Sequence, residues 1–378
     1  MEFMNPEEER KLIVEYNTRF PMKVELHVHL DGSVRPETVL DIAKERDMLS
    51  SLPHKTVEEL NRDVILVEPS SLDRLLQSFS YFMPIISGYK NAVSRIAYEL
   101  CEDCAKHRIR YMEVRYCPQL FANSDVTNEY VGEPGTFTPR DVVVTVNEAL
   151  ARGMKDYDVT VKTILCCMTH KPDWAPEVLS LCKEFRDKGV VGIDLAGLEF
   201  QPGTPAEECA LKKVFQEAAA CGIHRTVHAG EIGTARAVRE AIDEMKAERI
   251  GHGYHAYDDP EVYKKVINEH IHLETCPISS ILTKACDSDV TKHPLRKFVK
   301  DGVSYSLNTD DPVVLGNTLT DDYKFASDMG ITDEEIIRGI FNAARCCFSD
   351  VEERKSLVRQ LKEVYGPKYD YQSIHPHK

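Results

Sequence analysis

Residues 23–31 read Lys23-Val-Glu-Leu-His-Val-His-Leu-Asp31, with two histidines one residue apart in a run of alternating apolar positions. Every second side chain of a β-strand projects from the same face, so this stretch predicts a strand that points His27 and His29 into one site. Neutral imidazole is a preferred ligand of zinc, copper, nickel and iron. The two histidines therefore indicate the start of a metal site, whose other ligands should come from the same fold.

Seven further short runs have the composition of strands, and helical patterns lie between most of them. One such helical pattern is Leu211–Cys221, which Gly222 is placed to end. Strands that alternate with helices form a parallel sheet, and eight such units favour an α/β fold of the (β/α)8 TIM-type barrel over an open sheet. The predicted strands are Lys23–Leu30, Arg110–Tyr116, Thr160–Cys166, Val190–Ala196, His224–His228, Arg249–Gly251, His272–Cys276 and Val303–Asn308.

A helical insertion follows the first predicted strand. About 80 residues separate that strand from the second, against roughly 30 for a usual βα unit. Residues 35–107 contain Leu72, Leu75, Leu76 and Phe79 at helical spacing. An insertion after a barrel strand leaves from the catalytic face, so it is expected to form a lid, although packing on the outside of the barrel stays open. The chain, 1–378, is expected to form a single barrel domain.

Composition excludes several classes of protein. The 378 residues are 42% hydrophobic and 29% charged, with a net charge of −15 and no long run of Lys or Arg, so a nucleic-acid partner is not expected. No apolar stretch is long enough for membrane insertion, and no secretory signal is visible, which makes the cytoplasm the expected location. The twelve cysteines suit reduced, buried thiols, and Cys101-x-x-Cys104 lies in a helical pattern without a second such pair.

Reactive side chains recur at the carboxyl ends of the predicted strands, which is where barrel enzymes collect their chemistry. One polar residue at a strand end often only caps the next helix, but five such ends in one chain indicate an active site. These residues are His27, His29 and Asp31 on the first strand, Asp194 and Gly197 on the fourth, His228 and Glu231 on the fifth, His252 on the sixth, and Asp310 and Asp311 on the eighth.

A first set of ligands follows from these strand ends. His27, His29 and His228 offer nitrogen, and Asp310 offers oxygen. Three or four such ligands with a position left for water are typical of a catalytic zinc site. The fourth strand ends in Asp194-Leu-Ala-Gly197, without the lysine that bridges two metals in many barrel hydrolases, so one zinc ion per chain is expected.

The remaining strand-end residues are assigned to proton transfer and to substrate. A catalytic zinc ion lowers the pKa of its water to about 7, and His252 could take the proton of that water or hold the water in place. Glu231 is placed to act as a protonated general acid, provided that burial raises its pKa. A carboxylate beside a metal-bound one usually points elsewhere, so Asp311 is assigned to substrate.

These motifs, taken in order, resemble those of the adenosine and AMP deaminase family of metal-dependent barrel hydrolases. The resemblance spans roughly residues 20–350, and its motifs occur in family order. They are Val24-Glu-Leu-His-Val-His-Leu-Asp-Gly32, Tyr111-Met-Glu-Val-Arg-Tyr116, Asp194-Leu-Ala-Gly197, His224-Arg-Thr-Val-His-Ala-Gly-Glu231, Arg249-Ile-Gly-His-Gly-Tyr254 and Ser306-Leu-Asn-Thr-Asp-Asp-Pro312.

The resemblance implies hydrolytic deamination of adenosine, and of 2′-deoxyadenosine, to inosine plus ammonia by attack of zinc hydroxide at purine C6. It implies zinc on His27, His29, His228 and Asp310, with Asp310 also counted as catalytic. It further implies that Glu231 protonates purine N1, His252 steers the water, Asp311 holds N7, the Gly197 N–H meets N3, and Asp31 binds a ribose hydroxyl. Leu72, Leu75, Leu76 and Phe79 would form a hydrophobic lid. Leu198 departs from the acidic residue that close relatives often carry, which leaves side-chain contacts near Gly197 open.

Two alternatives stay open at this point. Deamination of AMP or N6-substituted AMP would need a phosphate site, and Asp31 at the ribose end would repel a 5′-phosphate, so a small purine nucleoside is favoured. A binding or scaffold protein that kept the barrel is the other alternative, yet no ligand and no proton donor is missing from the motifs. A monomer is expected, and a cell-surface protein docking on the outside of the barrel stays open as a second partner.

Overall fold

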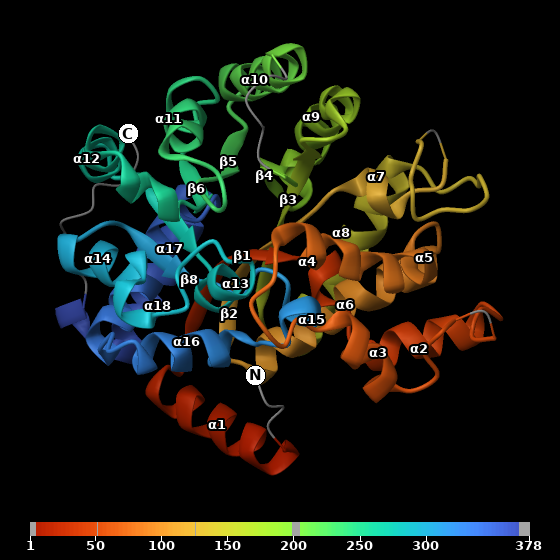
Figure 1. Cartoon of the computed structure of the whole chain (residues 1–378), viewed down its shortest axis with the longest axis horizontal. Helices are drawn as coiled ribbons and strands as arrows, with labels where there is room; N and C mark the ends of the chain where they lie inside the picture. The colour runs from red at the N-terminus through yellow and green to blue at the C-terminus, as the bar shows by residue number, and fades with distance from the viewer. Residues whose placement is uncertain (1–4, 51, 125, 199–204, 370–378) are drawn as a thin grey trace.

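Eight parallel strands in chain order form the centre of the molecule (Figure 1). The computed structural model describes residues 5–50, 52–124, 126–198 and 205–369. The predicted (β/α)8 barrel is confirmed, and every predicted strand is present with its bounds shifted by a few residues at most. The strands are β1 (Lys23–His29), β2 (Ile109–Tyr116), β3 (Thr160–Met168), β4 (Val190–Ala196), β5 (His224–Ala229), β6 (Arg249–His252), β7 (His272–Thr275) and β8 (Tyr305–Leu307).

The barrel closes where β1 meets the chain that follows β8. Val28 and Asp310 form a parallel bridge, in which the His29 N–H donates to the Asp310 carbonyl at 2.9 Å. The Asp310 N–H donates in turn to the His27 carbonyl at 3.1 Å. Lower in the seam, the Leu26 N–H donates to the side-chain oxygen of Asn308 at 2.9 Å, so an amide side chain stands in for a missing strand partner.

Helices surround the barrel, and several start with capping residues that the sequence provides. Thr138 and Asp141 form a capping box ahead of Pro139, and Thr332 and Glu335 form another, which satisfies the first free N–H groups of two long helices. The helices are α1 (Pro6–Arg19), α2 (Pro36–Glu45), α3 (Val57–Val64), α4 (Leu72–Ser78), α5 (Met83–Ile86), α6 (Lys90–Lys106), α7 (Pro118–Phe121), α8 (Pro139–Tyr157), α9 (Ala175–Phe185), α10 (Pro205–Ala220), α11 (Ala235–Asp243), α12 (Pro260–Asn268), α13 (Pro277–Leu282), α14 (Pro294–Asp301), α15 (Pro312–Leu315), α16 (Leu319–Asp328), α17 (Asp333–Cys346) and α18 (Val351–Tyr365).

The long segment between β1 and β2 holds α2 to α6, as expected of a helical insertion. Its longest helix, α6, buries Cys101 and Cys104 and packs against α8, while α4 lies nearer the ends of the strands. All twelve cysteines are free thiols and ten are buried; Cys209 and Cys221 are exposed. Within the described ranges, no helix combines the length and the apolar character that a membrane crossing requires.

Candidate active site

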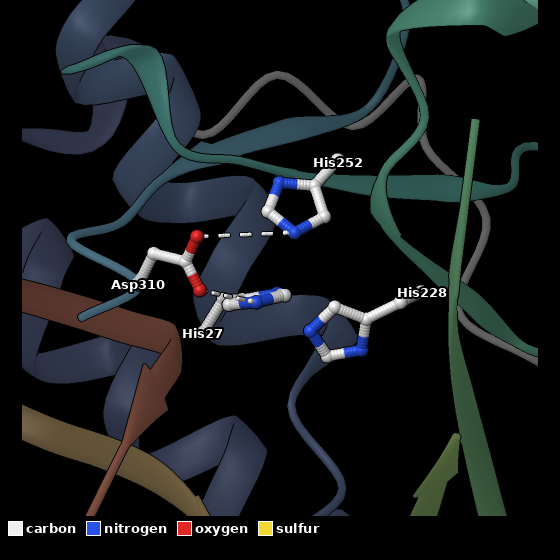
Figure 2. Close-up of side chains that lie close together, drawn as sticks. All are labelled: His27, His228, His252 and Asp310. Carbon is white, nitrogen blue, oxygen red and sulfur yellow. Dashed lines mark ion pairs between the residues drawn. The ribbon is translucent and has the colours of Figure 1, made fainter. Parts of the chain in front are cut away.

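The four predicted ligands lie together at the carboxyl ends of β1, β5 and β8. His27 Nε2 and His29 Nε2 lie 3.2 and 3.4 Å from Asp310 Oδ1, and His29 Nε2 lies 3.2 Å from His228 Nε2. Ligand atoms bound tetrahedrally at about 2.0–2.1 Å from zinc are roughly 3.3 Å apart, so these spacings suit one shared ion. Figure 2 shows His27, His228, His252 and Asp310 pointing toward one another from different strands.

The state of His27 tests whether a cation fits. Its Nδ1 lies 2.8 Å from Glu274 Oε2. Burial alone would raise the pKa of Glu274, but Arg115 and Arg249 hold it well below its usual range, so Glu274 accepts the Nδ1 proton. In the neutral ring, Nε2 then carries a lone pair that faces the Asp310 carboxylate, and it has no hydrogen-bond partner among the described residues. Two electron-rich atoms that face each other in a buried site fit a metal ion between them.

His228 is oriented in the same way from the opposite side. Its Nδ1 lies 3.0 Å from Asp194 Oδ2 and 3.0 Å from the Leu195 carbonyl, which turns Nε2 toward His29. Burial opposes ionisation of Asp194, yet His228 and Arg115 lower its pKa to about 2. Ser279 donates to Asp310 Oδ2 at 2.7 Å and fixes the carboxylate ligand. Such partners set the tautomer and direction of metal ligands.

A buried ladder of ion pairs runs down the barrel beneath the ligands. We call Asp194, Arg115, Glu274, Arg249 and Glu113 the interior ladder; each successive pair along it is 2.7–3.1 Å apart, and every member has a fully buried side chain. Its lower end is anchored by Phe348, whose ring lies 3.6 Å from the Arg249 guanidinium carbon and whose N–H donates to Glu113. Asp194 was expected at a strand end of the active site, whereas no role was predicted for Arg115, Glu274, Arg249 and Glu113.

His252 and Glu231 face the same centre. His252 Nε2 lies 3.6 Å from Glu231 Oε2 and 3.9 Å from Asp310 Oδ2. Burial lowers the pKa of His252 well below its ordinary value, which keeps the ring neutral and able to accept a proton. The donor atoms of His27, His228, His252 and Asp310 all lie within 4.8 Å of one another, so His252 could also reach an ion itself.

A pair of acidic residues lies beside the metal-ligating cluster. Burial and the neighbouring Asp310 charge raise the pKa of Asp311 well above its usual range, so Asp311 can donate a hydrogen bond. Burial also raises the pKa of Asp31. Gly32 lets these two segments approach, because a Cβ at this position would lie 2.0 Å from Asp311 Oδ1.

A cavity of about 660 Å³ opens over this cluster. It is lined by every predicted substrate-binding residue, namely Asp31, Leu72, Leu75, Leu76, Phe79, Gly197 and Asp311, and by His29, His228, Glu231, His252 and Asp310. His27 is fully buried behind it. Glu129, Tyr130 and His170 also line the cavity, and they were not predicted because their loops carry no motif. Leu198 is exposed next to Gly197 and stays out of the lining.

Comparison with known proteins identifies the family of the chain. Residues 22–364 match the family model described as adenosine deaminase. The chain belongs to the adenosine deaminase family. It is 48% identical to the adenosine deaminase of Xenopus tropicalis over 351 residues, which cover 91% of this chain and 96% of that protein. As a member of the adenosine deaminase family it is an enzyme, a hydrolase that carries out deamination.

Solved structures of the adenosine deaminase fold include enzymes with different substrates. An adenine deaminase from Arthrobacter aurescens is 25% identical, with a TM-score of 0.78 over 91% of this chain and 98% of that one. An Arabidopsis N6-mAMP deaminase is also 25% identical, with a TM-score of 0.76 over 90% of this chain and 98% of that one. Within one barrel, therefore, substrates range from a nucleobase to a nucleotide, and the cavity of each enzyme must make the choice.

Proposed function

We propose that the protein hydrolyses adenosine, and 2′-deoxyadenosine, to inosine or 2′-deoxyinosine and ammonia at one zinc ion. The convergence of three imidazoles and one carboxylate at the base of the cavity supports this most directly. The 48% identity to an adenosine deaminase over nearly the whole chain supports the nucleoside as substrate.

The proposed zinc ligands are His27, His29, His228 and Asp310. Three nitrogens and one oxygen suit zinc, and both groups of candidate metal-binding side chains in the described residues include Asp310, which favours a single ion. When bound, zinc supplies a Lewis acid that lowers the pKa of a coordinated water to about 7 and so provides a nucleophile at neutral pH.

Glu231 and His252 carry the proton steps of the proposal. A protonated Glu231 would donate to purine N1, which makes C6 electrophilic and open to attack by water. His252 is neutral and buried within 3.6 Å of Glu231, so it can orient the attacking water and hold the proton that this water gives up. Return of a proton to the amine then lets ammonia leave.

The cavity walls orient the purine in this scheme. A protonated Asp311 can donate to N7, and the Gly197 N–H, at a positive φ of 98°, can donate to N3. Asp31 can accept from a ribose hydroxyl. Leu72, Leu75, Leu76 and Phe79 present an apolar surface to the base, as a lid would.

The decisive experiment follows the ultraviolet absorbance of adenosine on mixing with the protein. We expect conversion to inosine by the zinc-loaded protein, none by chelator-treated protein, and recovery when one equivalent of zinc is restored. Metal analysis of the same samples should give one zinc per chain. Protein that contains one zinc but leaves adenosine unchanged would contradict the proposal and favour a binding or scaffold role.

A further inference from the structure

We infer that the mouth of the active-site cavity is an acidic subsite, formed by Glu129 with Asp31 and Asp73, that selects substrates by the charge of their 5′ substituent. It favours a cationic substituent, accepts the neutral hydroxyl and rejects a phosphate. This inference rests on the proposed function, because it takes an adenine nucleoside as the bound molecule.

The orientation of the nucleoside follows from the position of the reacting atom. C6 must meet the cluster of His228, Glu231 and Asp310, which is buried at the inner end of the cavity. N9, which carries the ribose, lies on the opposite side of the purine from C6. The ribose and its 5′ substituent therefore point toward the exposed end.

The exposed residues of the lining come from α4 with the turn after it, from the segment between α7 and α8, and from His170 after β3. Helix α4 contributes Asp73, Gln77 and Ser80 from its outer face and the turn after it. Residues between α7 and α8 contribute Glu129 and Tyr130. Burial raises the pKa of the Tyr130 phenol, and the nearby charges of Glu129 and Asp31 raise it further.

The position of Glu129 is fixed by its buried neighbour Asn128. The Asn128 side-chain amide donates to the carbonyls of Gln119, Leu120 and Ala122 at 3.0, 2.7 and 3.0 Å. Its side-chain oxygen accepts the Tyr130 N–H at 3.0 Å. The backbone on both sides of Glu129 is thus held, and its exposed side chain starts from a fixed point in the cavity lining.

The charges that line the cavity all have one sign, apart from histidines. Six carboxyl groups belong to the lining: Asp31, Asp73, Glu129, Glu231, Asp310 and Asp311. The proposed function takes Glu231 and Asp311 as protonated and Asp310 as a zinc ligand, so the charge of the mouth is carried by Asp31, Asp73 and Glu129. Of the described residues in that lining, none is Lys or Arg. The nearby Lys171 is outside the lining, and its ammonium lies 5.5 Å from the Trp174 ring. Phosphate sites need guanidinium, ammonium or backbone donors, whereas a cavity of one sign attracts the opposite charge.

The test uses three substrates that differ at the 5′ position: 5′-amino-5′-deoxyadenosine (cationic), adenosine (neutral) and AMP (anionic). Their kcat/KM values are measured with the zinc-loaded enzyme at low ionic strength, and the charged substrates are expressed relative to adenosine. We expect the wild type to rank the cationic compound at or above adenosine and AMP at least about a hundredfold below. Added salt should narrow both differences.

Two variants assign the effect to Glu129. Glu129→Gln should raise relative turnover of AMP and lower that of the amino compound, each by about three- to tenfold, because one charge near the substituent is removed. Glu129→Lys should extend both changes in the same directions. Glu133→Gln removes an exposed charge from the same loop outside the cavity lining, and it should leave both ratios unchanged.

The outcomes separate this inference from the proposed function. If adenosine is deaminated but both Glu129 variants leave the ratios unchanged, or shift them in the same direction, the acidic subsite is wrong and the proposed function stands. A preference of the wild-type enzyme for AMP over adenosine would also contradict the acidic subsite. If zinc-loaded protein deaminates none of the three substrates, the proposed function and this inference fail together.

Discussion

His252 and Asp310 both adopt left-handed backbone conformations, with φ of 63° and 71°. A non-glycine residue in this region costs of order 1–3 kcal/mol, and such residues cluster where a side chain must be aimed. Glycine would relieve the cost but could supply neither an imidazole nor a carboxylate. The strain therefore marks two strand ends at which the chain turns a reactive group into the centre.

At Glu231 the protonation step can be separated from metal binding. Glu231→Gln keeps the shape of the side chain but cannot deliver a proton, so we expect kcat to fall by about 10²–10⁴ while the zinc content stays at one per chain. Steady-state kinetics and metal analysis on the same preparation measure both quantities. Near-normal turnover in this variant would remove Glu231 from the proposed mechanism.

Gly32 tests the placement of Asp311 by sterics alone. In Gly32→Ala the new Cβ would lie 2.0 Å from Asp311 Oδ1 and 2.8 Å from its Cα, so part of the Asp311 backbone must shift. We expect a loss of at least about tenfold in kcat/KM for adenosine and of about 1–3 kcal/mol in the free energy of unfolding. Gly132→Ala is the matched control, because no atom lies within 4 Å of its added Cβ. Equal behaviour of the two variants would contradict the packing described.

The sequence predicted single residues well where spacing alone decides their direction. His27 and His29 share a face because strand side chains alternate, and Asp310 follows a strand whose end must meet theirs. Glu274 and Arg249 could not be assigned in this way. A charged residue on a short strand could face either the solvent or the inside of the barrel. Only the folded structure shows that each of these side chains has a partner of opposite charge inside the barrel. The catalytic roles given to individual residues stay predictions.

At the scale of elements, α4 is the segment that turns a barrel end into a cavity. Its Ser71 cap, whose hydroxyl accepts the Arg74 N–H, starts a helix that directs Leu72, Leu75 and Leu76 toward the cavity. Apolar spacing predicted this helix correctly. Glu129 and Tyr130 lie in a segment whose glycines and prolines indicate turns, but such residues do not say which way a loop folds.

Leu76→Ala tests whether α4 contacts the substrate. Leu76 lines the cavity and is half-buried, so its truncation removes apolar contact with a bound base. We expect KM for adenosine to rise by about three- to tenfold with little change in kcat, since about 0.7–1.4 kcal/mol of binding free energy is lost. Leu49→Ala trims a half-buried leucine of the same insertion outside the lining and should leave KM unchanged. A similar KM for both variants would argue against a lid.

Across the whole molecule, the interior ladder links the metal ligands to the chain after α17. Removing one member leaves buried charges without their partner, which typically costs 3–5 kcal/mol. We therefore expect Arg249→Met to lower the free energy of unfolding by about that amount, measured by urea denaturation. Arg239→Met breaks an exposed pair with Asp259 and should cost less than about 1 kcal/mol. If both variants lose equally little, the ladder contributes specificity rather than stability.

His107, buried at the end of α6, predicts part of the response to acid. Burial, helped by Lys106 and Lys23, lowers its pKa from 6.5 to about 3. Between pH 6.5 and pH 3 the unfolded chain binds a proton at His107 that the native state does not bind. The free energy of unfolding therefore decreases as the pH falls from 6.5 toward 3.

The corresponding variant is His107→Gln, studied as metal-free protein so that loss of zinc does not contribute. We expect its free energy of unfolding to depend less steeply on pH across that window, by up to about 1.4 kcal/mol per pKa unit. The exposed His270→Gln serves as the control. An unchanged slope in His107→Gln would show that other groups govern the acid transition.

The fold as a whole could be predicted because eight strands alternated with helices, and the family match confirms both barrel and deaminase. The closure of the barrel could not be predicted from the sequence, because the contact between the first and last strands depends on the Asn308 side chain and on one β-bridge. The cytoplasmic location, the monomeric state and an exterior docking partner stay predictions.

Asp310 occupies both the seam and the metal-ligating cluster: its backbone joins the two ends of the sheet while its carboxylate faces the imidazoles. An interaction that holds the Asp310 carboxylate in place therefore also stabilises the closure of the barrel between β1 and the chain after β8. The thermal stability of the whole protein should then increase with the fraction of sites that hold a metal ion, because a cation that binds only the folded chain stabilises it by mass action. If the proposed zinc ion is bound here, the protein in a zinc-depleted cell should be less stable as well as less active, and therefore more open to proteolysis.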